Sequence, residues 1–260
     1  MPRLFIASTL ITLLTGCSAA YTAPGGAADF RALGITPEVQ KAGTATDIQA
    51  AFDKKPLAAF PANVAVVRIQ QPGYRSETVH ASHGSGAFSV VTARDVESED
   101  AIDRLRKLPQ VRGIAPLGRM LMPNHFGSDR DLRAAAAQLQ CDLLLVYTFD
   151  TAFHDRDLAT PISVITLGLA PTQATQVTTT ASAVLFDTRN GYVYGLAEAT
   201  SSRKGIATAW NTKDAIDADR LKTEAEAFDK LVGNLETMWK GVVKEVGPDA
   251  PRGTKYGTTN

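Results

Sequence analysis

The run CDLLLVYTF, residues 141–149, constrains the fold most strongly, because it is apolar throughout except at Asp142 and Thr148. A short apolar run of this kind is typical of a strand that is covered on both faces, as the strands of a parallel sheet are. Cys141, at the start of the run, is interpreted as a small apolar residue near the core.

Strand and helix patterns alternate before this run. NVAVVRIQ (63–70) and FSVVTARDV (88–96) are rich in β-branched residues, and each predicts a strand. Ser98 is a suitable N-cap for a helix that follows the second of these strands. Ser128 and Asp131 approximate a capping box, which predicts a second helix leading directly into the run at 141–149.

Residues 181–200, ASAVLFDTRNGYVYGLAEAT, predict an antiparallel hairpin. Asn190-Gly191 lies between two β-rich stretches, and this dipeptide supplies the two positive φ values of a tight turn. Asp187 and Arg189 would then flank the turn in solvent, where turn chemistry accounts for Asp187 better than a metal-binding or catalytic role does.

A long helix is predicted from about Ala215 to Val246. Its apolar stripe is formed by Leu221, Ala225, Phe228, Val232, Leu235, Trp239, Val242 and Val246. The stripe favours a helix packed on a sheet over an intermolecular coiled coil, because it lasts less than about four heptads. These elements together predict an α/β fold with an α+β tendency: a mixed sheet with helices packed on it, in one domain over residues 44–246. Residues 247–260 are expected to form a flexible tail.

The N-terminus has the pattern of an export signal. Arg3 is followed by an apolar or small run from Leu4 to Leu14. A positive charge before roughly ten apolar residues is typical of a signal peptide, and the run is too short to span a bilayer. We therefore expect residues 1–16 to be a signal peptide.

The end of that run, Leu14-Thr15-Gly16-Cys17, resembles the lipobox of bacterial lipoproteins. The resemblance implies cleavage between Gly16 and Cys17 and lipid attached to Cys17; a buried thiol in a short helix is the alternative. Several acyl chains give a stable anchor. Ser18 in place of Asp favours an outer-membrane position, with the domain facing the periplasm and the inner membrane as the alternative. Residues 17–43 are expected to be the tether.

Charge and cysteine content exclude some partners. Without Arg3, the chain has 26 basic and 27 acidic side chains. A nearly neutral chain without basic runs gives no electrostatic reason to expect nucleic acid or anionic lipid as a partner. With Cys17 lipidated, Cys141 has no intramolecular partner, so no disulfide is expected.

The element order resembles the periplasmic α/β domain of the curli-export lipoprotein and the N-terminal domain of TolB. The resemblance is carried by LRAAAAQLQCDLLLVYTFDT, a helix that leads into a buried strand, and by the hairpin ASAVLFDTRNGYVYG. The chain also resembles the rhombotarget lipoproteins, although its end, GPDAPRGTKYGTTN, lacks the Gly-Gly, apolar helix and basic end of their processed tails. These resemblances imply a non-enzymatic component or helper of an envelope assembly.

Few residues are candidates for a chemical site. His154, Asp155 and Asp157 form a compact charged group that is expected just beyond the central strand, where ligand sites are common in α/β folds. A solvated loop is the alternative interpretation. His80 and His83 are three residues apart but have no nearby cysteine or carboxylate cluster to complete a metal site. The sequence contains no catalytic motif and indicates no cofactor.

Residues 158–186 carry no charge at all. Their second half alternates in polarity, which allows an export-channel subunit that contributes strands to a shared pore. An ordinary long strand preceded by an apolar loop is the simpler interpretation. The leading hypothesis is a lipid-anchored accessory protein, with the membrane as one partner and an envelope protein or a second copy as another. A metal-binding or hydrolytic domain is the further alternative.

Overall fold

The computed structural model describes residues 23–29, 33, 45–76, 82–157, 173–207 and 212–250. The predicted signal peptide (1–16), its cleavage site at Gly16 and the lipidation site Cys17 lie outside these residues. Of the predicted tail, only residues 247–250 are described.

The elements match the predicted fold class: a mixed sheet, packed helices and a long C-terminal helix. The helices are α2 (Ala45–Asp53), α3 (Glu99–Arg106), α4 (Asp129–Gln138) and α6 (Thr212–Val246), with a 3-10 helix η2 at Arg119–Leu121. The strands are β1 (Ala62–Gln70), β2 (Ser82–His83), β3 (Ser85–Gly86), β4 (Ser89–Val91), β5 (Val111–Pro116), β6 (His125–Phe126), β7 (Leu143–Asp157), β8 (Gln173–Asp187) and β9 (Val193–Ala207).

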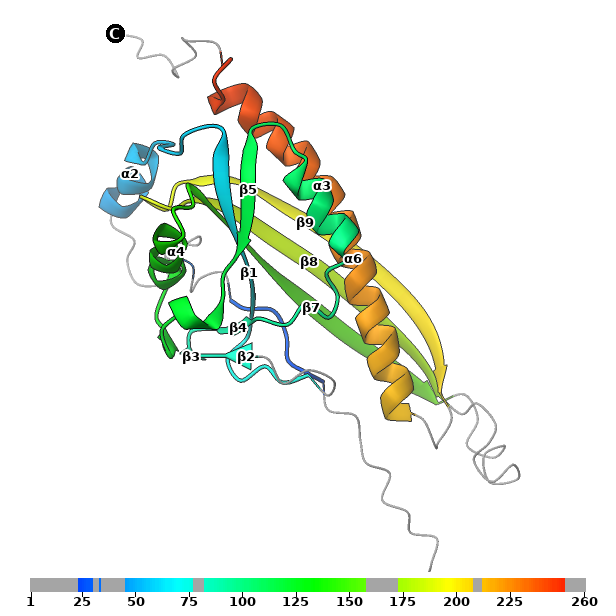
Figure 1. The fold of residues 1–260 in the computed structure, drawn as a ribbon. Helices are drawn as coiled ribbons and strands as arrows, with labels where there is room; N and C mark the ends of the chain where they lie inside the picture. The colour runs from blue at the N-terminus through cyan, green and yellow to red at the C-terminus, as the bar shows by residue number, and fades with distance from the viewer. Residues whose placement is uncertain are drawn as a thin grey trace, which may run out of the picture.

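Strand β7 lies inside the main sheet, as the apolar run at 141–149 predicted. It pairs in parallel with β1 on one side and antiparallel with β8 on the other. The order of the sheet is β2-β4-β1-β7-β8-β9, and β5 pairs in parallel with β1 beside β4 (Figure 1). The sheet is therefore mixed: its first half contains parallel pairs, and its second half is an antiparallel meander.

Strands β7, β8 and β9 are each 15 residues long, well beyond the lengths predicted from sequence. Strand β1 pairs with β7 only as far as Arg68 opposite Tyr147. The last part of the three strands therefore extends past the end of β1, with helix α6 beside it (Figure 1). We call residues 150–157, 173–180 and 200–207 the arm.

The β8–β9 hairpin is present, but its turn differs from the prediction. Gly191 has a positive φ of 69°, whereas Asn190 does not have a positive φ. The turn is instead a wider loop, in which the amide of Gly191 donates to the carbonyl of Asp187 at 2.9 Å. Asp187 is fully buried, contrary to the prediction that it lies in solvent. Its carboxylate accepts hydrogen bonds from the amides of Leu57 and Arg189 and from the hydroxyl of Tyr194, at 2.7–3.0 Å.

Two hydrophobic cores lie on opposite faces of the sheet. The first is formed with α3 and α6, and the second with α4 and the N-terminal residues Ala28 and Leu33. Cys141 is buried in the second core, as predicted. Burial on both faces explains why the central strand has no alternating pattern in the sequence.

Residues 23–29 pack on the domain although they belong to the segment 17–43 that was expected to be a tether. The carbonyls of Pro24 and Gly26 accept hydrogen bonds from the amides of Arg75 and Gln71, and Ala28 is 3% exposed. Small residues permit this close backbone approach to the sheet, because a Cβ atom at Gly25 would lie 2.6 Å from the side chain of Gln71.

Helix α6 follows the predicted length closely. The buried stripe agrees with the prediction from Phe228 to Val242, but Leu221 and Ala225 are only partly buried, while Arg220 and Glu224 are buried instead. The helix also binds the outermost strand. Two of its side chains donate to backbone carbonyls of β9: Asn234 to Glu198 at 2.6 Å and Lys230 to Thr200 at 3.2 Å.

The predicted helix caps are confirmed. Ser98 accepts a hydrogen bond from the amide of Ala101, and Ser128 and Asp131 form a complete capping box. The strand predicted over 88–96 is wrong in length, because β4 spans only Ser89–Val91. No helix in the part of the chain that the structure describes is long and apolar enough to cross a bilayer.

Candidate functional site

The segment 154–157 belongs to a strand, not to the loop that was predicted to follow the central strand. His154 pairs with Gln176, and Asp157 pairs with Gln173, at the end of the arm. The side chains of His154, Asp155 and Asp157 lie outside what the structure describes, so a site formed by these three residues stays a prediction.

The other predicted histidine pair is only half described. His80 lies outside the described residues. The Nε2 atom of His83 lies 3.2 Å from the carbonyl of Pro123, and its ring packs edge-on against Phe126. Among the residues that the structure describes, no group of three or more His, Cys, Asp or Glu side chains could hold a metal ion.

A buried charged cluster, which the sequence did not predict, is the most distinctive chemical feature of the described structure. It joins β1, the segment after β4 and the first half of α6. We call it the ionic cluster; its members are Arg68, Asp95, Glu97, Asp217, Arg220 and Glu224.

Arg68 is the centre of the ionic cluster, and only 2% of it is exposed. Its guanidinium contacts Asp95 at 2.9 Å, Glu224 at 3.4 Å and Glu97 at 3.7 Å. It also donates to the hydroxyl of Tyr74 at 3.1 Å and lies 4.6 Å from the ring centroid of Phe149. Burial alone would lower the pKa of Arg68, but the carboxylates of Glu224 and Glu97 raise it, so the group stays charged.

Arg220 extends the ionic cluster along α6. It donates to Asp217 at 2.9 Å, to Glu224 at 3.0 Å and to the hydroxyl of Ser76 at 3.1 Å. Glu224 thus lies between the two arginines, and its other oxygen accepts from Thr151 of β7 at 3.1 Å. The ionic cluster therefore ties α6 to the sheet and to the loop that follows β1.

Burial raises the pKa of Glu97 above the ordinary value for a glutamate. Nearby Arg68 and a 2.8 Å hydrogen bond from the hydroxyl of Tyr147 act in the opposite direction. Two arginines face four carboxylates here, so a proton on Glu97 reduces the excess of buried negative charge.

This raised pKa predicts a pH-dependent effect of Glu97→Gln. The folded state holds the Glu97 proton more tightly than the unfolded chain does, so its contribution to stability is present at low pH. It is lost as the pH rises from about the ordinary glutamate value, 4.5, toward the raised pKa. In urea unfolding, the variant should gain relative to wild type across that window, by at most about 1.4 kcal/mol per pH unit. A difference that is independent of pH would contradict this prediction.

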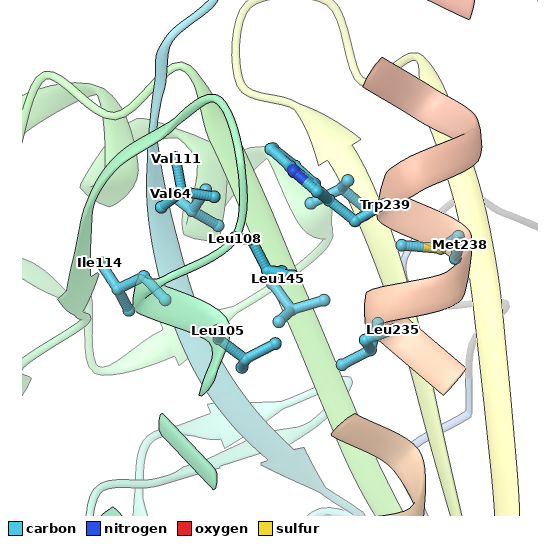
Figure 2. A pocket seen from close by; sticks show the side chains of 10 residues that line it. Val64, Leu105, Leu108, Val111, Ile114, Leu145, Leu235, Met238 and Trp239 are labelled. Carbon is cyan, nitrogen blue, oxygen red and sulfur yellow. The ribbon is translucent and has the colours of Figure 1, made fainter. Parts of the chain in front are cut away.

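Two small cavities border these elements. One of about 40 Å³ is lined by Arg68, Arg94, Glu97, Tyr147 and mainly apolar neighbours. The other, of about 30 Å³, lies between α3, β5 and α6, and its lining is apolar (Figure 2). A water molecule occupies about 30 Å³ in the liquid, so each cavity has the size of about one water molecule and neither admits an organic substrate.

The described half of the uncharged segment 158–186 has one buried face and one polar face. Val177, Ala181 and Ala183 are buried, and the latter two belong to the core with α6. The polar face, which we call the hydroxyl face, is formed by Gln176, Thr178, Thr180, Ser182, Glu198, Thr200 and Ser202. The predicted pore strand needs an uncovered apolar face, and residues 176–187 do not provide one; residues 158–172 lie outside the described structure.

Comparisons with known proteins give no family. No family model matches the chain, and no curated protein sequence matches it. A candidate lipoprotein from Caulobacter crescentus aligns over 43% of this chain and 78% of its own, at 16% identity and a TM-score of 0.28. A DUF330 protein from Xanthomonas campestris aligns over 72% and 92%, at 11% identity and a TM-score of 0.35. A hypothetical protein from Chlamydia trachomatis aligns over 68% and 96%, at 13% identity and a TM-score of 0.32. Likenesses this loose do not assign the chain to a family.

Proposed function

We propose that this protein is a lipid-anchored, periplasm-facing lipoprotein that acts as a non-enzymatic accessory component of a cell-envelope assembly. The observation that carries this proposal is the sequence Leu14-Thr15-Gly16-Cys17 directly after an apolar run of signal-peptide length. Lipid on Cys17 would hold the α/β domain at the membrane, most simply the outer membrane, since Ser18 follows the cysteine.

The geometry of the polar groups supports a binding role over a catalytic one. The charged groups of the ionic cluster contact one another, and the adjoining cavity has the size of one water molecule. The hydroxyl face, in contrast, presents accessible hydrogen-bonding groups of β8 and β9. The apolar side chain of Leu196, in β9, is 57% exposed. Exposed polar groups beside an exposed apolar side chain such as Leu196 are suited to contact with another macromolecule.

Replacing Cys17 tests the anchor. Cys17→Ser should abolish lipid attachment and cleavage before position 17, and any product that is cleaved elsewhere should be found in the soluble fraction of the envelope. The physical reason is that the acyl chains supply the membrane affinity, at about 0.8 kcal/mol per buried CH₂. Mass spectrometry of the wild-type N-terminus should show a lipidated cysteine at position 17.

Cys141→Ser is the matched control, because it replaces the other cysteine, which is buried in the second core. This variant should remain in the membrane fraction. A wild-type protein that begins with Met1, or that carries a free thiol at Cys17, would overturn the proposal. Crosslinking in intact cells tests the accessory role: a recurring envelope protein or a second copy is expected across the hydroxyl face, and turnover by the pure protein without such a partner would contradict it.

A further inference from the structure

We infer that the short link between the lipid and the domain holds the end of the arm at the surface of the phospholipid bilayer. This inference rests on the proposed lipidation of Cys17 and adds an orientation: the arm end faces the membrane, and the α2 end points away. The occupant proposed for the arm end is therefore the headgroup layer of the anchoring membrane.

The first step is where the ordered chain begins. Residues 23–29 are held on the domain by hydrogen bonds that include Pro24 to Arg75, Gly26 to Gln71, and the amide of Ala28 to the hydroxyl of Thr148 at 3.0 Å. Arg75 and Gln71 follow the end of β1, whereas Thr148 lies beside it. Traced backward from Ala28, the chain therefore leaves the sheet in the direction of the arm, and Figure 1 shows both at the same end of the molecule, with α2 at the other.

The second step is the reach of the link. Only residues 18–22 lie between the lipid-bearing Cys17 and the packed segment that begins at Ala23, so the link from Cys17 is six residue steps long. Six residues span at most about 20 Å when fully extended. A tether over all of residues 17–43, as the sequence suggested, would have allowed the domain to move much farther and in any orientation.

The third step is the length of the arm. The side chain of Gln70, the last residue of β1, donates to the carbonyl of Phe149 at 3.1 Å, so the two residues lie at the same level. Strand β7 continues from there to Asp157. Eight further residues at about 3.3 Å each extend the arm by about 26 Å, which is at least the reach of the link. With Cys17 at the membrane, the arm end therefore lies at its surface.

The chemistry of the arm suits headgroups more than hydrocarbon. Its accessible side chains include Gln176, Ser202 and Lys204, which are exposed hydrogen-bonding groups. The sequence of β7 ends with three ionisable residues, Asp155, Arg156 and Asp157, which would be costly to place in the hydrocarbon. Contact at the interface, without insertion, is the expected arrangement.

Lipid quenching in vesicles tests the orientation. The full-length protein, purified with its lipid and with Cys141→Ser, is reconstituted in vesicles of phosphatidylethanolamine and phosphatidylglycerol that contain a headgroup-linked quencher. Ala152→Cys, an exposed position on the arm, and Ala59→Cys, an exposed position just before β1 at the opposite end, each carry a fluorophore. At least threefold stronger quenching is expected at position 152 than at position 59.

A variant with a long Gly-Ser insertion between Thr22 and Ala23 tests the role of the link. It should reduce the quenching at position 152 to nearly that at position 59. Intact mass of the reconstituted protein separates the two proposals: a protein without lipid on Cys17 refutes the proposed function. Two results for a lipidated protein would overturn the inference about the arm: equal quenching at both positions, or quenching that the insertion does not change. Either result would leave the lipoprotein assignment intact.

Discussion

Arg68→Met is expected to lower the free energy of unfolding by about 3–5 kcal/mol, because it leaves buried carboxylates without their main counter-charge. Arg68 lies within 4 Å of Asp95, Glu97 and Glu224, and its side chain is 1% exposed. Methionine fills a similar space, so the loss reports mainly the charge and its hydrogen bonds. Urea unfolding followed by circular dichroism measures it.

Arg104→Met is the matched control for this loss. Arg104 also binds two carboxylates, those of Asp229 and Glu236, each at 2.7 Å, but its side chain is 40% exposed. Exposed ion pairs contribute about 0–1 kcal/mol, so the control should lose far less stability than the variant of Arg68. Adding Asp95→Asn to Arg68→Met should restore part of the loss, since Arg68 is the arginine that pairs with Asp95 and its removal leaves that carboxylate uncompensated. Equal losses at Arg68 and Arg104 would refute a special role for the ionic cluster.

Trp239→Ala is expected to lower the free energy of unfolding by about 3–5 kcal/mol. The indole is 3% exposed, packs against the ring of Phe60 at a centroid distance of 5.9 Å and donates to the carbonyl of Pro109 at 2.6 Å. It also forms part of the wall of the apolar cavity in Figure 2. Truncation would enlarge that cavity, remove the ring contact and leave a carbonyl without its donor.

Met120→Ala is the control for truncation of a large apolar side chain, since Met120 is 98% exposed in η2. It should change the free energy of unfolding by no more than about 0.5 kcal/mol. A loss below about 1 kcal/mol for Trp239→Ala would mean that the α3–α6 interface contributes little to the stability of the domain.

The parts of the fold that the sequence predicted are those with strong local signals. The central strand followed from its apolar run, and the start of α3 followed from Ser98, whose side chain accepts from the helix as a cap does. The hairpin was placed correctly, but its turn was not. Asn190-Gly191 favours two positive φ values, whereas the buried carboxylate of Asp187 binds three donors and draws the chain into a wider loop.

The ionic cluster could not be assembled from sequence, because its partners are distant along the chain and meet only when α6 lies on the sheet. Two signals were nevertheless present. Arg68 is the one charged residue in the run NVAVVRIQ, and Arg220 and Glu224 lie eight and four residues before Phe228, in line with the apolar stripe. A charge at a position that the periodicity assigns to the core indicates a buried partner of opposite sign.

The length of the arm and the packing of residues 23–29 were also missed. The Thr-rich sequence of β8 shows only a weak alternation of apolar and polar residues, so it did not reveal the length of the strand. In the structure, the outward hydroxyls of Thr178 and Thr180 form hydrogen bonds with hydroxyls of β9. Residues 23–29 contain few large apolar side chains, and they are held mainly by backbone hydrogen bonds, which leave no periodic trace in a sequence.

On the proposal that Cys17 carries lipid, the contacts of Asn234 and Lys230 with strand β9 bear on whether molecules concentrated on one membrane pair through their edge strands. A high protein concentration at a surface favours association through any exposed edge strand whose backbone groups are unpaired. The carbonyls of Glu198 and Thr200, which an incoming polypeptide would need as acceptors, are already occupied by α6. Losing those two side-chain contacts would leave the helix in place and expose a template for fibril growth.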